Sequence, residues 1–264
     1  MELIDTHCHL TFDELAGGVE GVIERSKAAG VVGWITVGTD PQQNRKAVEF
    51  AERYENVYAA VGIHPHEART ADDKTISELK QLAGNKKVVA IGETGLDFHR
   101  GACFHGLEAR ATEQQQDCFT RHLEIAAELK LPVIIHSREA FDETIEILSK
   151  YGSGLRGVVF HCFSGSAEQA KIVLDRGFYI SFTGVVTFKN AEKTRRAAEV
   201  VPLDRLMVET DCPYMSPEPM RKQKVNEPAF MIHTARCLAQ LKQMDLADFA
   251  QKITATSKTF FCLP

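Results

Sequence analysis

Two histidines stand one residue apart near the start of the chain, in the stretch MELIDTHCHL. In a strand, residues i and i+2 point to the same face, so His7 and His9 can reach one ion while Cys8 turns away. The same pattern fits a strand end with two hydrogen-bonded structural histidines. Taken alone, the pair favours the structural interpretation, and the rest of the chain must decide.

Further histidines and carboxylates follow short apolar runs along the chain. They are Asp5 beside the first pair, His64 in GIHPH, Glu93 in IGETGLD, His136 in IIHSRE, His161 in VFHCFSG and Asp211 in VETDCPY. Each one also fits a hydrogen-bonded or capping residue. If they converge on one place, however, the cluster would be costly without a cation or a proton to share.

These side chains offer nitrogen and oxygen ligands without a thiolate. Such a set suits Zn, Mn or Ni, and where carboxylates predominate among the ligands it also suits Mg. Because there are more ligands than one tetrahedral ion takes, we predict two divalent ions about 3.5–4 Å apart. A ligand shared by both ions must be anionic and bidentate, and Glu93 is the natural candidate because its strand lies between the other contributors. We interpret Cys8, Cys162 and Cys212, each next to a predicted ligand, as buried packing thiols.

Short runs rich in Val and Ile alternate with amphipathic segments and must position these side chains. Strands are predicted over residues 2–5, 33–37, 57–63, 88–92, 132–136, 157–161, 178–182 and 205–209. Helices are indicated over 19–30, 112–130, 166–177 and 226–241, with Gly30 and Gly177 at helix ends, Thr112 and Ser166 as N-caps and Pro228 near a helix start.

Eight strand–helix units predict a (β/α)8 barrel, in one domain over residues 1–264. In barrel enzymes the chemistry sits at the carboxyl ends of the strands, which is where the polar residues occur. A doubly wound sheet is the alternative, but no Gly-x-Gly-x-x-Gly follows the first strand. A long loop over 98–110 contains His99, Cys103 and His105, and we expect it to be a lid or a surface excursion rather than a metal site.

The composition excludes some classes of protein. The net charge of -5 argues against a general nucleic-acid-coating surface, though not against a local basic patch. No apolar run approaches the ~18 residues of a membrane span, and the N-terminus lacks a signal-peptide pattern. The 7 cysteines are scattered without a CxxC pair. They indicate reduced thiols and a cytoplasmic location.

The motifs DTHCHL, VGIHPH, AIGETGLD, LPVIIHSRE, VFHCFSGS, FTGVVTFKNA, ETDCPYMSPE and NEPAF occur in this order along essentially the whole chain. Together they resemble the TatD family of metal-dependent deoxyribonucleases, within the amidohydrolase-like superfamily. The resemblance implies a (β/α)8 barrel that hydrolyses phosphodiester bonds in nucleic acid, commonly as a 3′-to-5′ exonuclease. By position, it implies that His7, His9, Glu93 and Asp211 hold one ion and that Glu93, His136 and His161 hold the second.

The resemblance also suggests how the catalytic residues act. Two cations would lower the pKa of a water between them, and Asp211 would take or orient its proton. We expect His64 to donate to a phosphate oxygen or to the leaving group. Glu209, which shares a predicted strand face with Asp211, would orient ligands from behind.

Positive charge for phosphate binding is limited. Arg138 would hold phosphate, although a salt bridge to Glu139 or Asp142 fits equally well. The family commonly has Gly-Lys-Arg before Asn-Glu-Pro, whereas this chain reads RKQKVNEP and keeps only Lys224 of the three. With Lys189, Arg221 and Lys222 nearby, this narrow basic track suits a single strand, so we expect single-stranded DNA as substrate and no obligatory protein partner.

Two other functions remain open from the sequence. The first is a metal-dependent hydrolase of a small amide, ester or lactone, or of D-aminoacyl-tRNA, because the same ions polarise carbonyls equally well. The second is a non-catalytic scaffold that holds metal, which should show saturated coordination.

Overall fold

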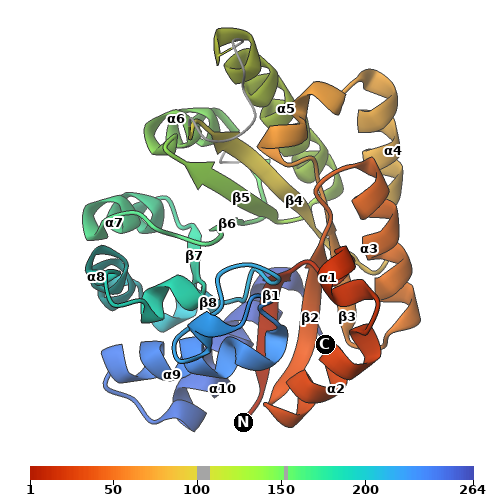
Figure 1. Cartoon of the computed structure of the whole chain (residues 1–264). Coiled ribbons are helices and arrows are strands. Elements are labelled where there is room, and N and C mark those ends of the chain that lie inside the picture. The colour runs from red at the N-terminus through yellow and green to blue at the C-terminus, as the bar shows by residue number, and fades with distance from the viewer. Residues whose placement is uncertain (100–107, 152–153) are drawn as a thin grey trace. The chain divides into compact units, whose positions relative to one another are not determined.

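Eight β-strands follow one another in a single sheet, in the order β1-β2-β3-β4-β5-β6-β7-β8 (Figure 1). In this computed structural model they are β1 Leu3–Cys8, β2 Val31–Val37, β3 Val57–Val61, β4 Val88–Asp97, β5 Val133–Arg138, β6 Val158–Phe160, β7 Tyr179–Phe182 and β8 Leu206–Val208. The structure describes residues 1–99, 108–151 and 154–264.

Helices alternate with the strands along the chain. Within the described residues they are α1 Asp13–Ala16, α2 Val19–Ala28, α3 Pro41–Arg53, α4 Asp73–Ala83, α5 Glu108–Leu129, α6 Phe141–Tyr151, α7 Ala167–Asp175, α8 Glu192–Val200, α9 Met231–Leu241 and α10 Leu246–Phe261. Parallel strands in chain order with intervening helices define a (β/α)8 barrel, which confirms the predicted fold class. A doubly wound sheet is excluded, because its strand order reverses at a switch point.

Several strands run further than predicted. β1 ends at Cys8, β4 at Asp97 and β5 at Arg138. As a result His7 and Glu93 lie inside strands and not after them, and His136 lies within β5 rather than at its end. In these strands the alternation of side chains between the two faces therefore continues beyond the apolar run, into the polar residues that follow it.

The predicted loop over 98–110 is shorter at its C-terminal end. α5 begins at Glu108, so Thr112 lies within the helix and does not cap it, contrary to the prediction. Cys103 and His105 lie outside the described residues. His99 is described, and its Nδ1 lies 2.6 Å from Glu139 Oε1.

The predicted caps of α7 are found. The Ser166 hydroxyl accepts the N–H of Gln169 at 3.3 Å, and the Gln169 side chain accepts the N–H of Ser166 at 2.9 Å, which makes a reciprocal capping box. Gly177 follows the helix with φ 74°, a left-handed conformation that glycine adopts without strain. Pro228 opens a short 3₁₀ helix, Pro228–Phe230, that leads into α9.

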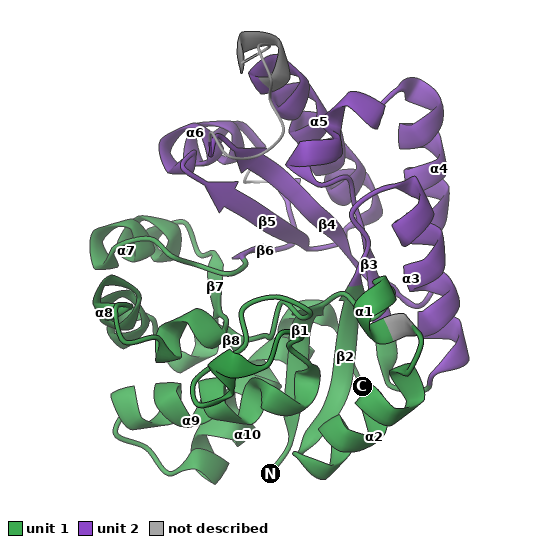
Figure 2. Cartoon of the chain, in the orientation of Figure 1, with its two compact units in different colours: residues 1–36, 55–57, 161–264 green, residues 37–54, 58–160 purple. Residues whose placement is uncertain are grey.

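The chain divides into two compact units (Figure 2). Unit 1 comprises residues 1–36, 55–57 and 161–264, and unit 2 comprises residues 37–54 and 58–160. In unit 1, α10 packs against β1 and β8, and Phe249 of α10 is fully buried. In unit 2, α5 packs on β4 and buries Phe119. None of the described helices is long and apolar enough to cross a membrane.

Candidate metal centre

The first group of ligand-type side chains lies in unit 1, where β1 meets the segment after β8. His7 is part of β1, His9 follows directly, and Asp211 comes three residues after β8. The Asp211 N–H donates to the His7 carbonyl at 2.9 Å, and the His9 N–H donates to the Cys212 carbonyl at 2.9 Å. This backbone pairing brings a carboxylate from the C-terminal part of the chain to the His-x-His pair.

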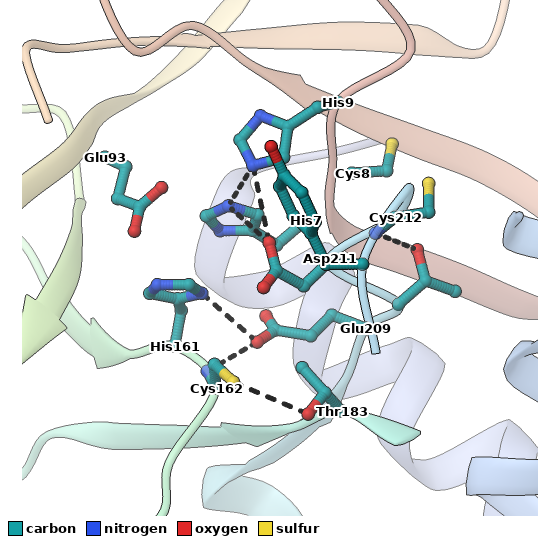
Figure 3. A network of polar contacts seen from close by, with 12 residues as sticks. His7, Cys8, His9, Glu93, His161, Cys162, Thr183, Glu209, Asp211 and Cys212 are labelled. Atoms are coloured by element: carbon teal, nitrogen blue, oxygen red, sulfur yellow. Dashed lines mark hydrogen bonds and ion pairs between the residues drawn. The ribbon is translucent and has the colours of Figure 1, made fainter. Parts of the chain in front are cut away.

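Three donor atoms of this group face one another (Figure 3). His7 Nε2 lies 3.3 Å from His9 Nε2. Asp211 Oδ1 lies 3.3 Å from His9 Nε2 and 3.7 Å from His7 Nε2. Four ligands at about 2.0–2.1 Å from a tetrahedral ion stand about 3.3–3.4 Å apart, so these atoms have the chemistry and the spacing of a divalent-metal site.

Asp211 is held as a carboxylate. Burial raises its pKa, but the hydrogen bond from His9 and the charges of His7 and His161 outweigh that effect, so the net pKa lies below the ordinary value. Its backbone φ of 53° falls in the left-handed region, which Asp and Asn tolerate better than most residues.

His161 and Glu209 lie next to this group. The His161 ring stacks on His7 with centroids 4.1 Å apart, and its Nδ1 is 3.4 Å from Glu209 Oε1. Glu209 also accepts the Cys162 N–H at 2.5 Å and the Ser181 hydroxyl at 2.5 Å. The contact fits the expected orienting role of Glu209. The predicted shared strand face with Asp211 is wrong, because β8 ends at Val208.

Asp5 does not join the donors of the first group. It lies within β1, is fully buried, and accepts the N–H and the hydroxyl of Thr210 at 3.0 and 2.6 Å. Burial raises its pKa to about 7 despite these hydrogen bonds. Because Thr210 precedes Asp211, Asp5 anchors the segment that carries the ligand.

The cysteines next to the ligands differ in burial. Cys8 and Cys212 are buried, and their thiols point away from the three donor atoms (Figure 3). The Cys8 thiol donates to the Ile35 carbonyl at 3.2 Å. Cys162 is only half-buried, contrary to the prediction, and its sulfur lies 3.5 Å from Thr183 Oγ1.

The second group lies in unit 2, on β4, β5 and the turn after β3. His136 Nδ1 is 2.6 Å from Glu93 Oε1, and His64 Nε2 is 3.7 Å from the same oxygen. Gly62 allows the backbone before His64 to lie close to the backbone before Glu93, since a Cβ at Gly62 would stand 2.5 Å from the Gly92 carbonyl carbon. The donor set again consists of imidazoles and a carboxylate, as a divalent ion requires.

Sequence reasoning missed two members of this second group, His66 and Asp97. Asp97 Oδ2 lies 2.8 Å from His66 Nε2 and 3.1 Å from His136 Nε2. Burial raises the pKa of Asp97, but the hydrogen bonds from His136 and His66 outweigh it, so the net pKa lies well below the usual range. The signal was available: Asp97 is four residues after Glu93, on the same face of a strand that was predicted to end too early.

His64 is a neutral imidazole of defined tautomer. Its Nδ1 accepts the backbone N–H of His66 at 3.1 Å, which assigns the ring proton to Nε2. Burial lowers its pKa to about 3, and the nearby Glu93 carboxylate only partly offsets this effect.

The two predicted phosphate-binding cations are exposed. Arg138 ends β5 on the same face as His136, two residues away. Within the described residues it forms no ion pair with Glu139 or Asp142, and Glu139 pairs with His99 instead. Lys224 is exposed and follows the short 3₁₀ helix Met220–Lys222, where the Arg221 guanidinium stands 3.9 Å above the Phe188 ring.

Comparison with known proteins finds relatives along the whole chain. The family model for TatD-related DNases matches residues 4–262. A Bacillus subtilis protein named as an uncharacterised metal-dependent hydrolase is 39% identical over 98% of this chain and 98% of its own. The 3′-5′ ssDNA/RNA exonuclease TatD of Cronobacter sakazakii is 36% identical over 93% of this chain and 92% of its own. The crystal structure of a TatD homologue from Escherichia coli K12 is similar with a TM-score of 0.90 and 32% identity, over 99% of this chain and 98% of that one.

Proposed function

The chain belongs to the family of TatD-related DNases and is a metal-dependent hydrolase, and on this premise we propose that it is a nuclease that cleaves phosphodiester bonds of single-stranded nucleic acid. The observation that carries the proposal is the pair of ligand groups, each with imidazoles and an ionisable carboxylate within 4.8 Å of one another. The relative named as a 3′-5′ ssDNA/RNA exonuclease supports the substrate class and the direction.

We propose two divalent ions per chain, one at each group. His7, His9 and Asp211 would hold the first, and Glu93 and His136 would hold the second. Such ions lower the pKa of a water molecule and neutralise charge on phosphoryl oxygens. A bridging role for Glu93 and a place for His161 at the second ion follow from the family resemblance and remain predictions.

Asp211 is the proposed general base. Its Oδ1 faces the two imidazoles, so we assign Oδ2 to accept the proton of the attacking water. The lowered pKa keeps the carboxyl ionised, so Oδ2 carries no proton at neutral pH. Glu209 steadies His161 from behind, through a contact of 3.4 Å to the imidazole.

His64 is proposed to donate a hydrogen bond from Nε2–H to a phosphate oxygen. The tautomer set by the His66 N–H leaves this proton on the nitrogen that faces Glu93. Of the two roles expected from the sequence, the neutral ring favours the hydrogen bond to a phosphate oxygen over proton donation to the leaving group.

Arg138 and Lys224 are proposed to contact phosphate, since both are exposed and Arg138 shares a strand face with His136. We also propose a cytoplasmic protein that needs no protein partner for activity. Reduced thiols are found at Cys8, Cys118, Cys162, Cys212 and Cys237, which is the state that the cytoplasm maintains.

The test is a hydrolysis panel with the Mn- or Zn-loaded chain. The substrates are a 5′-labelled single-stranded DNA, the same sequence as RNA, its blunt DNA duplex, a bis-aryl phosphodiester, D-aminoacyl-tRNA, and simple esters and amides. We expect a ladder of DNA products shortened from the 3′ end, and slower loss of the duplex. Turnover of aminoacyl-tRNA, esters or amides without any phosphodiester cleavage would overturn the proposal.

A further inference from the structure

We propose that Tyr214 is a stacking platform for one nucleobase of the substrate, at the edge of the first metal group. The inference rests on the proposed function, and it names a binding residue for the base rather than for the phosphate. Base–aromatic stacking is tolerant of sequence, because every base has a π-face, and it suits an enzyme that acts on single strands.

Tyr214 is unusually exposed for an aromatic residue of this chain. Its relative exposure is 51%, and it is the one aromatic side chain in the exposed class among the described residues. Single exposed apolar side chains are common on protein surfaces, but this ring stands three residues after Asp211 and beside His9, which gives its exposure a functional meaning.

The ring lies against a metal-ligand side chain. Its centroid is 6.5 Å from that of His9, and the planes are inclined by 66°. Its centroid is also 6.3 Å from that of Phe12 in a T-shaped arrangement, and Phe12 in turn stacks on His9 with centroids 4.5 Å apart. A base stacked on Tyr214 would therefore bring its own backbone phosphate next to the donor atoms of the first group.

The backbone around Tyr214 is fixed relative to Asp211. The Tyr214 N–H donates to the Asp211 carbonyl at 3.0 Å, and the buried Asn226 amide donates to the carbonyls of Tyr214 and Thr210 at 2.6 and 3.0 Å. One amide thus ties both sides of Asp211 together. A platform that is already rigid pays less ordering entropy when a base binds.

The charge around this segment matches a nucleic-acid strand. Arg221, Lys222 and Lys224 follow Tyr214 in the same connection between β8 and α9, and all three are exposed. Exposed cations and an exposed aromatic ring in one connection supply the two parts of a single-strand site, in which the charge follows the phosphates and the ring holds a base.

The experiment combines substitutions at Tyr214 with removal of single bases. The substrates are tetranucleotides in which each position in turn is abasic, and the enzymes are wild type, Tyr214→Leu, Tyr214→Phe and the control Ile172→Ala, which trims another exposed apolar side chain in unit 1. KM and kcat are measured separately for the metal-loaded enzymes.

We expect Tyr214→Leu to raise KM for the intact tetranucleotide by about 5- to 150-fold, with a smaller change in kcat. Tyr214→Phe should retain the wild-type KM, and Ile172→Ala should match wild type throughout. At one position of the tetranucleotide, removing the base should raise the KM of wild type by the same factor as Tyr214→Leu does. The same removal should raise the KM of the Leu variant little further. This non-additivity identifies the base that stacks.

Two other results overturn the inference in distinguishable ways. If wild type cleaves the tetranucleotides but the losses from Tyr214→Leu and from base removal add at every position, Tyr214 holds no base and the proposed function stands. If wild type cleaves none of them, the proposed function fails, and the stacking role fails with it.

Discussion

The two ligand groups differ in how their donor atoms are held. In the first group, the nitrogens and the carboxylate oxygen stand 3.3–3.7 Å apart, and the side chains of His7 and His9 are 0% and 4% exposed. In the second group, His136 makes short contacts of 2.6 and 3.1 Å to Glu93 and Asp97, and its side chain is 16% exposed. The first group has the spacing of a metal site, whereas the second is drawn together by shorter hydrogen bonds between its own members.

This difference has a thermodynamic consequence. A histidine ligand must offer a neutral nitrogen, so an ion held by His136 Nδ1 and Glu93 would replace the proton shared between them. In the first group the hydrogen bond from His9 to Asp211 must also be exchanged, but it is longer, at 3.3 Å against 2.6 Å between His136 and Glu93, so less is lost. We therefore expect the first ion to bind more tightly than the second, and the following predictions test that contrast.

The largest effect is expected for Asp211→Asn. Asn retains the size of the side chain and accepts the φ of 53°, so the fold should persist. It cannot take a proton from water, and loss of a general base costs about 10²–10⁴-fold in turnover. Steady-state kinetics and thermal melting check this, with exposed Asp204→Asn as the control. A folded variant with wild-type turnover would remove Asp211 from the mechanism.

Asp97→Asn should act on the second ion alone. The carboxylate orients His136 through Nε2, and loss of such a partner typically weakens metal binding about 10- to 100-fold. Competition with a chromophoric chelator would measure both affinities. The control is Asp142→Asn, an exposed aspartate of the same unit. Equal weakening at both ions would indicate a general structural defect instead.

Much of the first group could be predicted from the sequence. The His-x-His pair and Asp211 are marked by position, because each follows or ends an apolar run that forms a strand. What the sequence does not display is the hydrogen bond between Asp211 N–H and the His7 carbonyl, since it joins residues near opposite ends of the chain. The strand order had to be known before that contact could be inferred.

The second group was predicted only in part. His64, Glu93 and His136 were found. Asp97 was not, because the apolar pattern of β4 stops at residue 92 while the strand continues to Asp97, and His66 was not, because it lies in the short 3₁₀ helix Pro65–Thr70 after β3. The last part of β4, ETGLD, is polar and is buried in the interior, so hydrophobicity underestimates its length. Strands that end in buried polar residues with a function are expected to mislead a prediction based on hydrophobicity.

A smaller effect, on the pH dependence of stability, is expected from His122, which is hydrogen-bonded to the backbone of Ile63, the residue before His64. Its Nε2 accepts the Ile63 N–H at 2.9 Å, and burial lowers its pKa from 6.5 to about 4. Between these values the unfolded chain binds the proton more readily, so stability falls as the pH falls from 6.5 towards 4. Through His122 alone, the free energy of unfolding should be about 2 kcal/mol lower at pH 5 than at pH 7.5.

The measurement is urea unfolding of the metal-free chain at these two pH values, for wild type and His122→Gln. The Gln variant should lose less stability on acidification, by about the same 2 kcal/mol. Identical losses in both proteins would show that the acid sensitivity arises elsewhere.

The smallest effect is expected for Cys162→Ser in the first unit. The sulfur contacts Thr183 and Met215 and is no part of the donor set. Both metal equivalents and turnover should therefore remain as in wild type. Loss of either equivalent in a folded variant would make the thiol a ligand.

The central claim is that each ligand group holds its own ion, and metal titration with elemental analysis tests it most directly. Wild type, His9→Ala and His136→Ala are loaded with Mn or Zn, freed of excess metal and measured per chain. We predict two equivalents for wild type, bound in two steps, with the tight step lost in His9→Ala and the weak step lost in His136→Ala. A wild-type chain that never exceeds one equivalent, or two variants that lose the same step, would contradict the account.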